Sequence, residues 1–187
     1  MAVSVIDFEF HSSNETHPTI VCCALDGRVY WSTELAKLKK AILERRDNVF
    51  IGFYTIAEAR CFIALDLNPL DFKWLDLYSE FKMLQNSNND FKYGPYIDKA
   101  GEKCFSIARD VDDESDDDDN TTVPSNLINA VYKLCKINLD TIHKRKMRDI
   151  ILTKDVHLID NYRKEISEYC ISDTKYLEPL LKAIMVQ

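Results

Sequence analysis

Hydrophobic and polar positions alternate at the start of the chain in a way that predicts a β-strand. An apolar run at residues 3–6 continues into a stretch where carboxylates and aromatic rings take turns: Asp7, Phe8, Glu9 and Phe10. Because successive side chains of a strand point to opposite faces, Asp7 and Glu9 should share one face, and the two rings should face the core between the sheet and its helices. Two interpretations of the acidic face stay open. It is either a solvated surface or a site for a divalent cation, because hard cations bind oxygen ligands.

The same patterning predicts strands and helices further along the chain. Residues 19–25 and 28–31 are β-branched and apolar, and Asp26-Gly27 between them predicts a tight hairpin, since such turns need positive φ. The remaining expected elements, in chain order, are a helix from Ser32 or Thr33 to about residue 46, a strand at 48–53, a helix opening at Thr55, a strand at 72–77, a helix to about residue 85, a helix from Pro124 to about Lys136, and helical structure from 158 to 187 with a joint near Ser172. Strands early in the chain and helices at its end indicate an α/β fold, in which a mixed β-sheet is flanked by α-helices.

The length of 187 residues fits one domain, residues 1–187, with a sizeable core. A net charge of −7 would disfavour nucleic acid as a partner if the acids were spread evenly. However, residues 110–119 alone contain eight Asp and Glu, so the rest of the chain has a net charge of +1. We therefore expect an irregular acidic insertion at about residues 87–122, and a body whose charge is compatible with a nucleic-acid substrate.

Cysteine usage and hydropathy predict an intracellular protein. Six cysteines without a CxxC pair or metal-ligand spacing are typical of reduced thiols in a core. No apolar run approaches the roughly 20 residues of a membrane span, and no charged-then-apolar leader opens the chain. We expect a cytoplasmic protein with no membrane partner.

Two residues near the C-terminal end complete a candidate metal site. Tyr169 and Asp173 are four residues apart, so a helix would put them on one face. If Asp173 lies beside the acids of the first strand, and Glu58 joins from the middle helix, four carboxylates converge. Two divalent ions, Mg²⁺ or Mn²⁺, are the natural charge balance, and they would clamp the attacking and leaving oxygens of a phosphodiester displacement. The Tyr169 phenol would position the attacking water or help to deprotonate it.

Glu58 has a second, purely structural explanation. The spacing from Thr55 to Glu58 is that of a capping box, in which the two side chains satisfy N–H groups at the start of a helix. Asp76 is the substitute candidate for the metal site, with the alternative that it caps the helix that follows it.

These motifs resemble those of a known enzyme family. Asp7-Phe-Glu9, an acid early in a middle helix, and Tyr169-x-x-x-Asp173 are similar in order and spacing to the three exonuclease motifs of the DEDD superfamily, in its tyrosine subgroup. The stretches 74–77 and 144–151 also resemble this group, in particular the proofreading 3′–5′ exonuclease domains of phage family A DNA polymerases. The middle stretch, 52–58, departs from the pattern, because it lacks the His-Asn pair that many relatives carry before an Asp. The resemblance covers most of the chain outside the acidic insertion.

The resemblance implies a ribonuclease H-like fold and a metal-dependent 3′–5′ exonuclease that hydrolyses phosphodiester bonds of single-stranded DNA by a two-metal mechanism. A polymerase domain or a replication protein is then a candidate partner. By the same resemblance, Asp7, Glu9 and Asp173 would hold the metal that activates water, with Asp7 bridging to the second ion. Glu58 would help to hold that second ion. Two alternatives stay open: the same chemistry on RNA, and a non-catalytic module that binds nucleic acid or protein on the same scaffold.

Aromatic and basic residues near these motifs are candidate substrate contacts. Rings at the start of the middle motif could stack on terminal bases, and the basic run at 144–148 could contact phosphates. The alternatives are core packing for the rings and a solvated helix face for the basic run. The candidates are Phe8, His11, Phe53, Tyr54, Lys144, Lys146 and Arg148.

Overall fold

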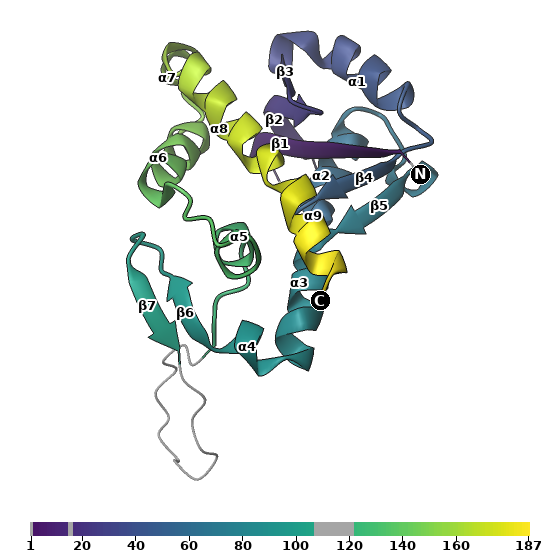
Figure 1. Cartoon of the computed structure of the whole chain (residues 1–187). Helices are drawn as coiled ribbons and strands as arrows, with labels where there is room; N and C mark the ends of the chain where they lie inside the picture. The colour runs from purple at the N-terminus through teal and green to yellow at the C-terminus, as the bar shows by residue number, and fades with distance from the viewer. Residues whose placement is uncertain (1, 15–16, 107–121) are drawn as a thin grey trace.

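A mixed β-sheet with helices on both faces forms the body of the molecule (Figure 1). The computed structural model describes residues 2–14, 17–106 and 122–187. The main sheet has five strands in the order β3-β2-β1-β4-β5, namely β1 (Val3–Asn14), β2 (His17–Leu25), β3 (Arg28–Trp31), β4 (Val49–Gly52) and β5 (Lys73–Asp76). β1, β2 and β3 pair antiparallel, whereas β4 pairs parallel with both β1 and β5. This confirms the predicted α/β class with a mixed sheet.

The hairpin between β2 and β3 has the predicted turn. Asp26 and Gly27 both have positive φ, 50° and 78°, and Leu25 pairs with Arg28 across the turn. Asp26 also ties this turn to β1, because its carboxylate accepts a hydrogen bond of 2.9 Å from the Val5 N–H. The hairpin therefore fixes the N-terminal part of β1 in the sheet.

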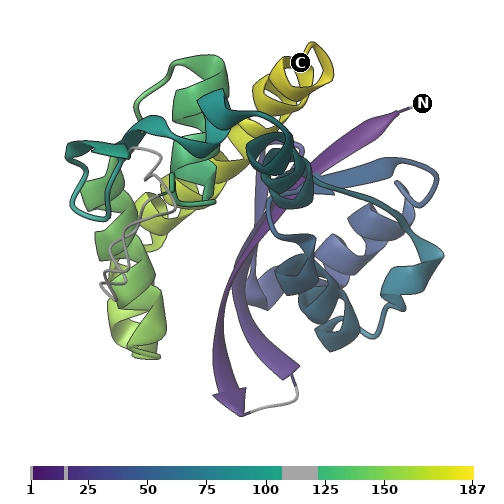
Figure 2. The ribbon, with the colours of Figure 1, turned by 90° about the horizontal axis from the view of Figure 1, so that it is seen from below.

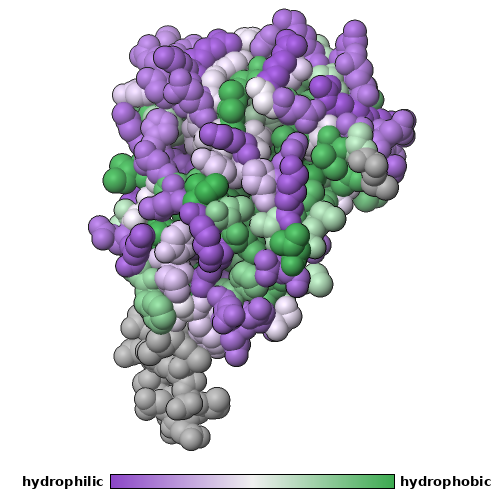
Figure 3. Space-filling model, viewed as in Figure 1, coloured by the Kyte–Doolittle hydropathy of each residue, from purple (hydrophilic) through white to green (hydrophobic). Residues whose placement is uncertain are grey.

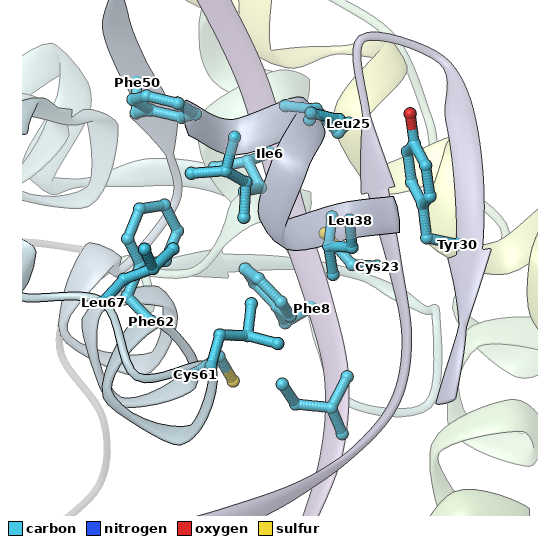
Figure 4. Close-up of a cluster of buried hydrophobic side chains, with 14 of the residues drawn as sticks. Ile6, Phe8, Cys23, Leu25, Tyr30, Leu38, Phe50, Cys61, Phe62 and Leu67 are labelled. Atoms are coloured by element: carbon cyan, nitrogen blue, oxygen red, sulfur yellow. The ribbon is translucent and has the colours of Figure 1, made fainter. Parts of the chain in front are cut away.

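One face of the sheet is covered by α1 (Leu35–Leu43) and α2 (Thr55–Ala64). A 3₁₀ turn at Ser32–Glu34 precedes α1, so the α-helix begins later than the sequence predicted. Leu38 and Ile42, one helical turn apart, are both fully buried. Side chains from the two helices meet Phe8 of β1 in an aromatic-rich core (Figure 4).

The opposite face carries two further groups of helices (Figure 2). On the antiparallel strands lie α6 (Thr141–Leu152) and α8 (Arg163–Lys175), with α7 (Val156–Asn161) between them in the chain. On the parallel strands lie α3 (Leu77–Ser87), α5 (Leu127–Cys135) and α9 (Leu177–Met185). Alternation along β1 separates the cores, because Val5 faces this second group while Ile6 faces α1 and α2.

The stretch expected to be irregular, residues 87–122, is partly regular. It contains the short helix α4 (Asn89–Lys92) and an antiparallel hairpin of β6 (Gly94–Ile97) and β7 (Lys103–Ser106). Asn129 of α5 holds this hairpin, since its side chain accepts from the Ile97 N–H (2.7 Å) and donates to the Ile97 carbonyl (3.1 Å). The structure thus differs from the expectation at residues 89–106. The acidic run at 110–119 lies outside the described residues.

The predicted joint near Ser172 lies at Tyr176 instead, between the end of α8 at Lys175 and the start of α9. Pro179 explains this position, because it has no N–H to donate to the Lys175 carbonyl and its ring would clash with that carbonyl in a continuous helix. Since α8 is uninterrupted up to Lys175, Tyr169 and Asp173 share one face of a single helix.

Hydrophilic and hydrophobic side chains are interspersed over the face of the molecule seen in Figure 3. Among the described residues, no helix combines the length and the apolar character needed to span a lipid bilayer. All six cysteines are free thiols, and those at positions 22, 23, 61 and 170 are buried.

Candidate active site

A pocket lies beside the part of β1 that extends beyond its pairing with β4. β1 is 12 residues long, but β4 pairs only with residues 3–5 of it, so within the described residues the later part of β1 has no strand beside it on that edge. The pocket has a volume of about 460 Å³ and is walled by β1, α2, α6 and α8, and we call it the β1 pocket. The five predicted catalytic side chains all line it: Asp7, Glu9, Glu58, Tyr169 and Asp173.

Helix α8 is held against the sheet by contacts along its length. The Trp31 indole N–H donates to the Ser167 hydroxyl (3.1 Å). One turn further along the helix, the Cys170 thiol lies 3.6 Å from the Asp7 carbonyl oxygen. The next turn carries Asp173, which is thereby brought to the acids of β1.

The acids of the β1 pocket are too close and too buried to ionise together easily. Burial raises the pKa of Asp7 from 3.8 to about 7, and the charge of Asp173 adds to the rise. Burial raises the pKa of Glu9 well above its usual value, and the charges of Asp7 and Asp173 act in the same direction. Burial also raises the pKa of Asp173, although Lys144 opposes it. Such a group is stabilised by added positive charge.

Glu58 reaches the pocket from the start of α2. The capping box predicted for this helix is absent: the N-cap is Tyr54, in the left-handed conformation with φ 73°, and among the described residues no side chain makes the cap hydrogen bond. Gly52 makes room for Glu58, because a Cβ on this glycine would lie 3.3 Å from Glu58 Cγ. Glu58 is therefore not used to start its own helix and instead faces the pocket.

Glu58 carries a polar atom that the described residues leave unsatisfied. The residue is 3% exposed, and its Oε2 has no hydrogen-bond partner among them. Burial raises the pKa of Glu58 well above its usual value, and the charge of Asp7 adds to the rise. A buried carboxylate oxygen without a partner is costly, and a cation beside it would remove that cost.

Asp76, the substitute candidate, has a structural role. Its carboxylate accepts hydrogen bonds from the N–H groups of Tyr54 (2.9 Å) and Tyr78 (3.1 Å) and from the Ser79 hydroxyl (3.2 Å). It is thus the N-cap of α3, and it does not line the β1 pocket. Of the two explanations for Asp76, the geometry agrees with the cap.

Tyr169 presents its phenol to the pocket from a largely buried ring. The residue is 9% exposed and belongs to the same buried cluster as Met147 and Ile151 of α6. Burial raises its pKa, and the charge of Glu9 adds to the rise, so the phenol keeps its proton at neutral pH. It can therefore donate a hydrogen bond to a water molecule, but it is a poor base.

The basic run of α6 is divided between different roles. Lys144 forms an ion pair with Asp173, both side chains being largely buried. Lys146 lies over the ring of Tyr162, 4.9 Å from its centre, and does not line the pocket. Arg148 is exposed and lines the pocket. Arg148 thus adds an exposed positive charge to the pocket wall, whereas Lys144 neutralises an acid.

A second pocket, also of about 460 Å³, adjoins the β1 pocket and shares Arg148, Tyr169 and Asp173 with it. It lies between the β6–β7 hairpin, α5, α6 and α8, and Lys99 and Arg145 add positive charge to its wall. Arg145 donates a hydrogen bond to the Lys99 carbonyl, which fastens the hairpin to α6. The two pockets together offer an acidic and a basic compartment side by side.

Phe53 and Tyr54 line the β1 pocket at the start of α2. Both rings pack edge-to-face on Tyr78, with centroid distances of 5.8 and 5.3 Å. Tyr54 is 49% exposed, and its left-handed backbone is rare for a bulky residue and costs roughly 1 kcal/mol or more. An exposed ring held in this way beside a pocket is suited to stacking on a base.

Phe8 belongs mainly to the core. It is 5% exposed and packs edge-to-face on Phe62 at 6.2 Å, as alternation along the strand predicted, although it is also among the residues that line the pocket. His11 does not line the pocket. Its Nδ1 is buried without a hydrogen-bond partner among the described residues, and burial lowers its pKa, with Lys154 contributing. The structure does not bring His11 to the acids.

Arg60 and Cys170 bear ionisable side chains near the site and were not among the sequence-based candidates. Arg60 lines the β1 pocket from α2, two residues after Glu58. Residues two apart on a helix do not share a face, so the sequence did not place Arg60 beside Glu58. Cys170 lies beneath Asp7, and an isolated cysteine next to Tyr169 carries no spacing signal either.

The donor set of the β1 pocket suits divalent cations. It offers carboxylate oxygens from three elements, including the unpartnered Glu58 Oε2, and hard cations prefer such ligands. Comparison of the chain with protein-family models, with curated proteins and with solved structures gave no match. The function proposed below therefore relies on the geometry of the site and on the sequence motifs.

Proposed function

We propose that this chain is a metal-dependent 3′–5′ exonuclease of the DEDD superfamily, with a ribonuclease H-like fold, and that it acts on single-stranded DNA. One observation carries the proposal: Asp7, Glu9, Glu58 and Asp173 line a single pocket together with Tyr169. Asp7, Glu9, Tyr169 and Asp173 resemble the first and last motifs of the family, and Glu58 is the acid of the middle stretch that departs from the family pattern. They come from β1, α2 and α8, which lie far apart in the chain.

The architecture supports the same proposal. Three antiparallel strands are followed by two parallel strands, with helices on both faces, and two of the acids, Asp7 and Glu9, lie on the first strand, which is central in the sheet. This arrangement is compatible with a ribonuclease H-like fold.

The proposed site would hold two Mg²⁺ or Mn²⁺ ions. Asp7, Glu9 and Asp173 would bind one of them, and Asp7 and Glu58 the other. When bound, such ions neutralise the clustered acids and stabilise the charge that develops on the attacking and leaving oxygens of a phosphodiester. The convergence of these carboxylates in one pocket and the unpartnered Glu58 oxygen fit residues that would hold cations.

The remaining side chains have roles that follow from their places. The protonated Tyr169 phenol donates a hydrogen bond that orients the attacking water. Tyr54 and Phe53 stack on the terminal base, and the exposed Arg148 pairs with a phosphate. Because Arg148 lines both pockets, the strand extends from the acidic pocket toward the basic one.

Digestion of 5′-labelled single-stranded DNA with Mg²⁺ or Mn²⁺ tests this function. The proposal predicts a ladder of products shortened from the 3′ end, which is absent for Asp7→Ala and present for the matched control Asp160→Ala at an exposed position. A matched RNA in a parallel reaction decides between DNA and RNA as substrate. If neither nucleic acid is shortened with either metal, the proposal is wrong, and the non-catalytic binding module becomes the better account.

A further inference from the structure

The thiol of Cys170 lies directly beneath the acids of the proposed metal site. Cys170 is fully buried on α8, and its Sγ is 3.9 Å from Asp7 Oδ2. One ligand atom each from Asp7, Glu9 and Cys170 lie within 4.8 Å of one another. When a Zn²⁺ ion binds sulfur at about 2.3 Å and oxygen at about 2.0–2.2 Å, its ligand atoms lie roughly 3–4 Å apart. Small side-chain movements would therefore let these three share one ion.

Neither Asp7 nor Glu9 forms an ion pair in the described part of the chain. The nearby Lys144, whose charge partly offsets the rise in the pKa of Asp7, is paired with Asp173. A second and independent sign comes from α2. There the buried Glu58 lines the same pocket, with an oxygen that has no hydrogen-bond partner. The pocket thus holds an unpartnered buried ligand oxygen, Glu58 Oε2, in addition to the group formed by Asp7, Glu9 and Cys170.

We propose that Cys170 is a ligand, with Asp7 and Glu9, of a metal ion in the β1 pocket, and that it makes the site prefer sulfur-accepting ions such as Zn²⁺, Co²⁺ and Cd²⁺ over Mg²⁺. This inference rests on the proposed metal-dependent function. Soft sulfur ligands select against Mg²⁺, which keeps oxygen ligands. Binding releases the thiol proton to solvent, since the thiolate is the ligand.

A neighbouring thiol does not share this position. Cys22 is also fully buried and hydrogen-bonds with Cys170, but it is not part of the three-residue group. Cys61 is equally buried and belongs to the core on the opposite face of the sheet, so it offers a matched control for loss of a buried thiol.

Titration of the full-length chain with Co²⁺ tests the proposal, because a thiolate bound to cobalt gives a charge-transfer absorption band. We expect this band at one equivalent in the unsubstituted chain and in Cys61→Ser, and its loss in Cys170→Ser and Cys170→Ala. Competition should show that Cys170→Ser lowers the affinity for Zn²⁺ by about tenfold or more while leaving that for Mg²⁺ unchanged.

The possible failures are distinguishable. If Co²⁺ binds to the unsubstituted chain without the band, or if the band survives Cys170→Ser, then Cys170 is not a ligand and a site made of carboxylates alone stands. If neither Co²⁺ nor Mn²⁺ binds by calorimetry, the inference and the proposed function fail together. The absence of the band in the unsubstituted chain would overturn the proposal by itself. The test therefore does not depend on whether the substituted chains fold.

Discussion

The two faces of β1 show opposite chemistry one residue apart. On one side, Phe8 is almost completely buried and packs in an aromatic core with Phe62. On the other, Asp7 and Glu9 face a pocket and have raised pKa values. The first face stabilises the fold by removing apolar surface from water. The second destabilises the fold whenever its acids are ionised without a counter-charge.

This difference separates stability from function within one strand. A residue of the apolar face should matter for folding and little for chemistry, whereas a residue of the acidic face should matter for chemistry and be unfavourable for folding. Such opposition is expected where a site is arranged for a ligand rather than for the stability of the chain alone.

The largest effect on stability is expected on the apolar face. Phe8→Ala should lower the free energy of unfolding by about 3–5 kcal/mol, because it removes a buried ring and leaves a cavity. Chemical denaturation measures this change. The control is Phe105→Ala on β7, where the side chain is 69% exposed and the loss should be small. Equal effects of the two substitutions would show that the Phe8 face is not the core.

Substitution on the acidic face should change the free energy of unfolding in the opposite direction. In the absence of metal at pH 8, Asp7→Asn should raise the free energy of unfolding by on the order of a few kcal/mol, since it removes a carboxylate that is hard to ionise in place. The raised pKa means that the folded chain binds more protons than the unfolded chain between pH 3.8 and about 7. The stability of the metal-free chain should therefore be greatest at acidic pH and fall as the pH rises through this window.

Denaturation at a series of pH values tests whether the free energy of unfolding falls as the pH rises. Asp7→Asn should flatten the profile between about pH 4 and 7, whereas Asp160→Asn, at an exposed site, should leave it as it is. A metal-free chain whose stability increases over this range would mean that the acids are already compensated within the protein.

Tyr169→Phe should lower turnover by roughly ten- to a hundredfold and leave metal affinity nearly unchanged, because the phenol is proposed to orient water and not to bind metal. Single-turnover cleavage and Mn²⁺ titration separate the two effects. Tyr162→Phe is the control, since that ring lies under Lys146 and outside the pocket. An unchanged cleavage rate would assign Tyr169 to packing.

A smaller effect is expected at Gly52. Gly52→Ala would place a Cβ 3.2 Å from Thr55 Cγ2 and 3.3 Å from Glu58 Cγ, so the acid must shift by a few tenths of an ångström. We expect a loss of metal affinity of up to about tenfold, with little change in melting temperature. Calorimetric titration with Mn²⁺ measures it. Unchanged affinity would show that Glu58 is not a ligand.

The sequence predicted the parts of the molecule that depend on local periodicity. Alternation predicted the two faces of β1, and the Asp26-Gly27 pair predicted the hairpin. The four-residue spacing predicted that Tyr169 and Asp173 share one face of a helix. These features follow from neighbours in the chain, which is where sequence patterns carry their information.

Features that depend on packing between distant segments were not predictable in this way. The Thr55–Glu58 spacing predicted a capping box, but packing around Gly52 and the pocket turned Glu58 inward. The ion pair of Lys144 with Asp173 and the position of Cys170 beneath Asp7 also arise only when α6 and α8 fold against β1. The β6–β7 hairpin was missed because β6 begins with Gly94-Pro95, a pair that signals a turn rather than a strand in a sequence.

The most direct measurement of the central claim is the number of Mn²⁺ ions that the chain binds, determined by electron paramagnetic resonance or calorimetry at pH 8. The account predicts two ions per chain, a rise in melting temperature when they bind, and the loss of at least one ion in Asp7→Asn. Binding of no ion, or binding that Asp7→Asn leaves unchanged, would contradict the claim that the acidic face of β1 is a metal site.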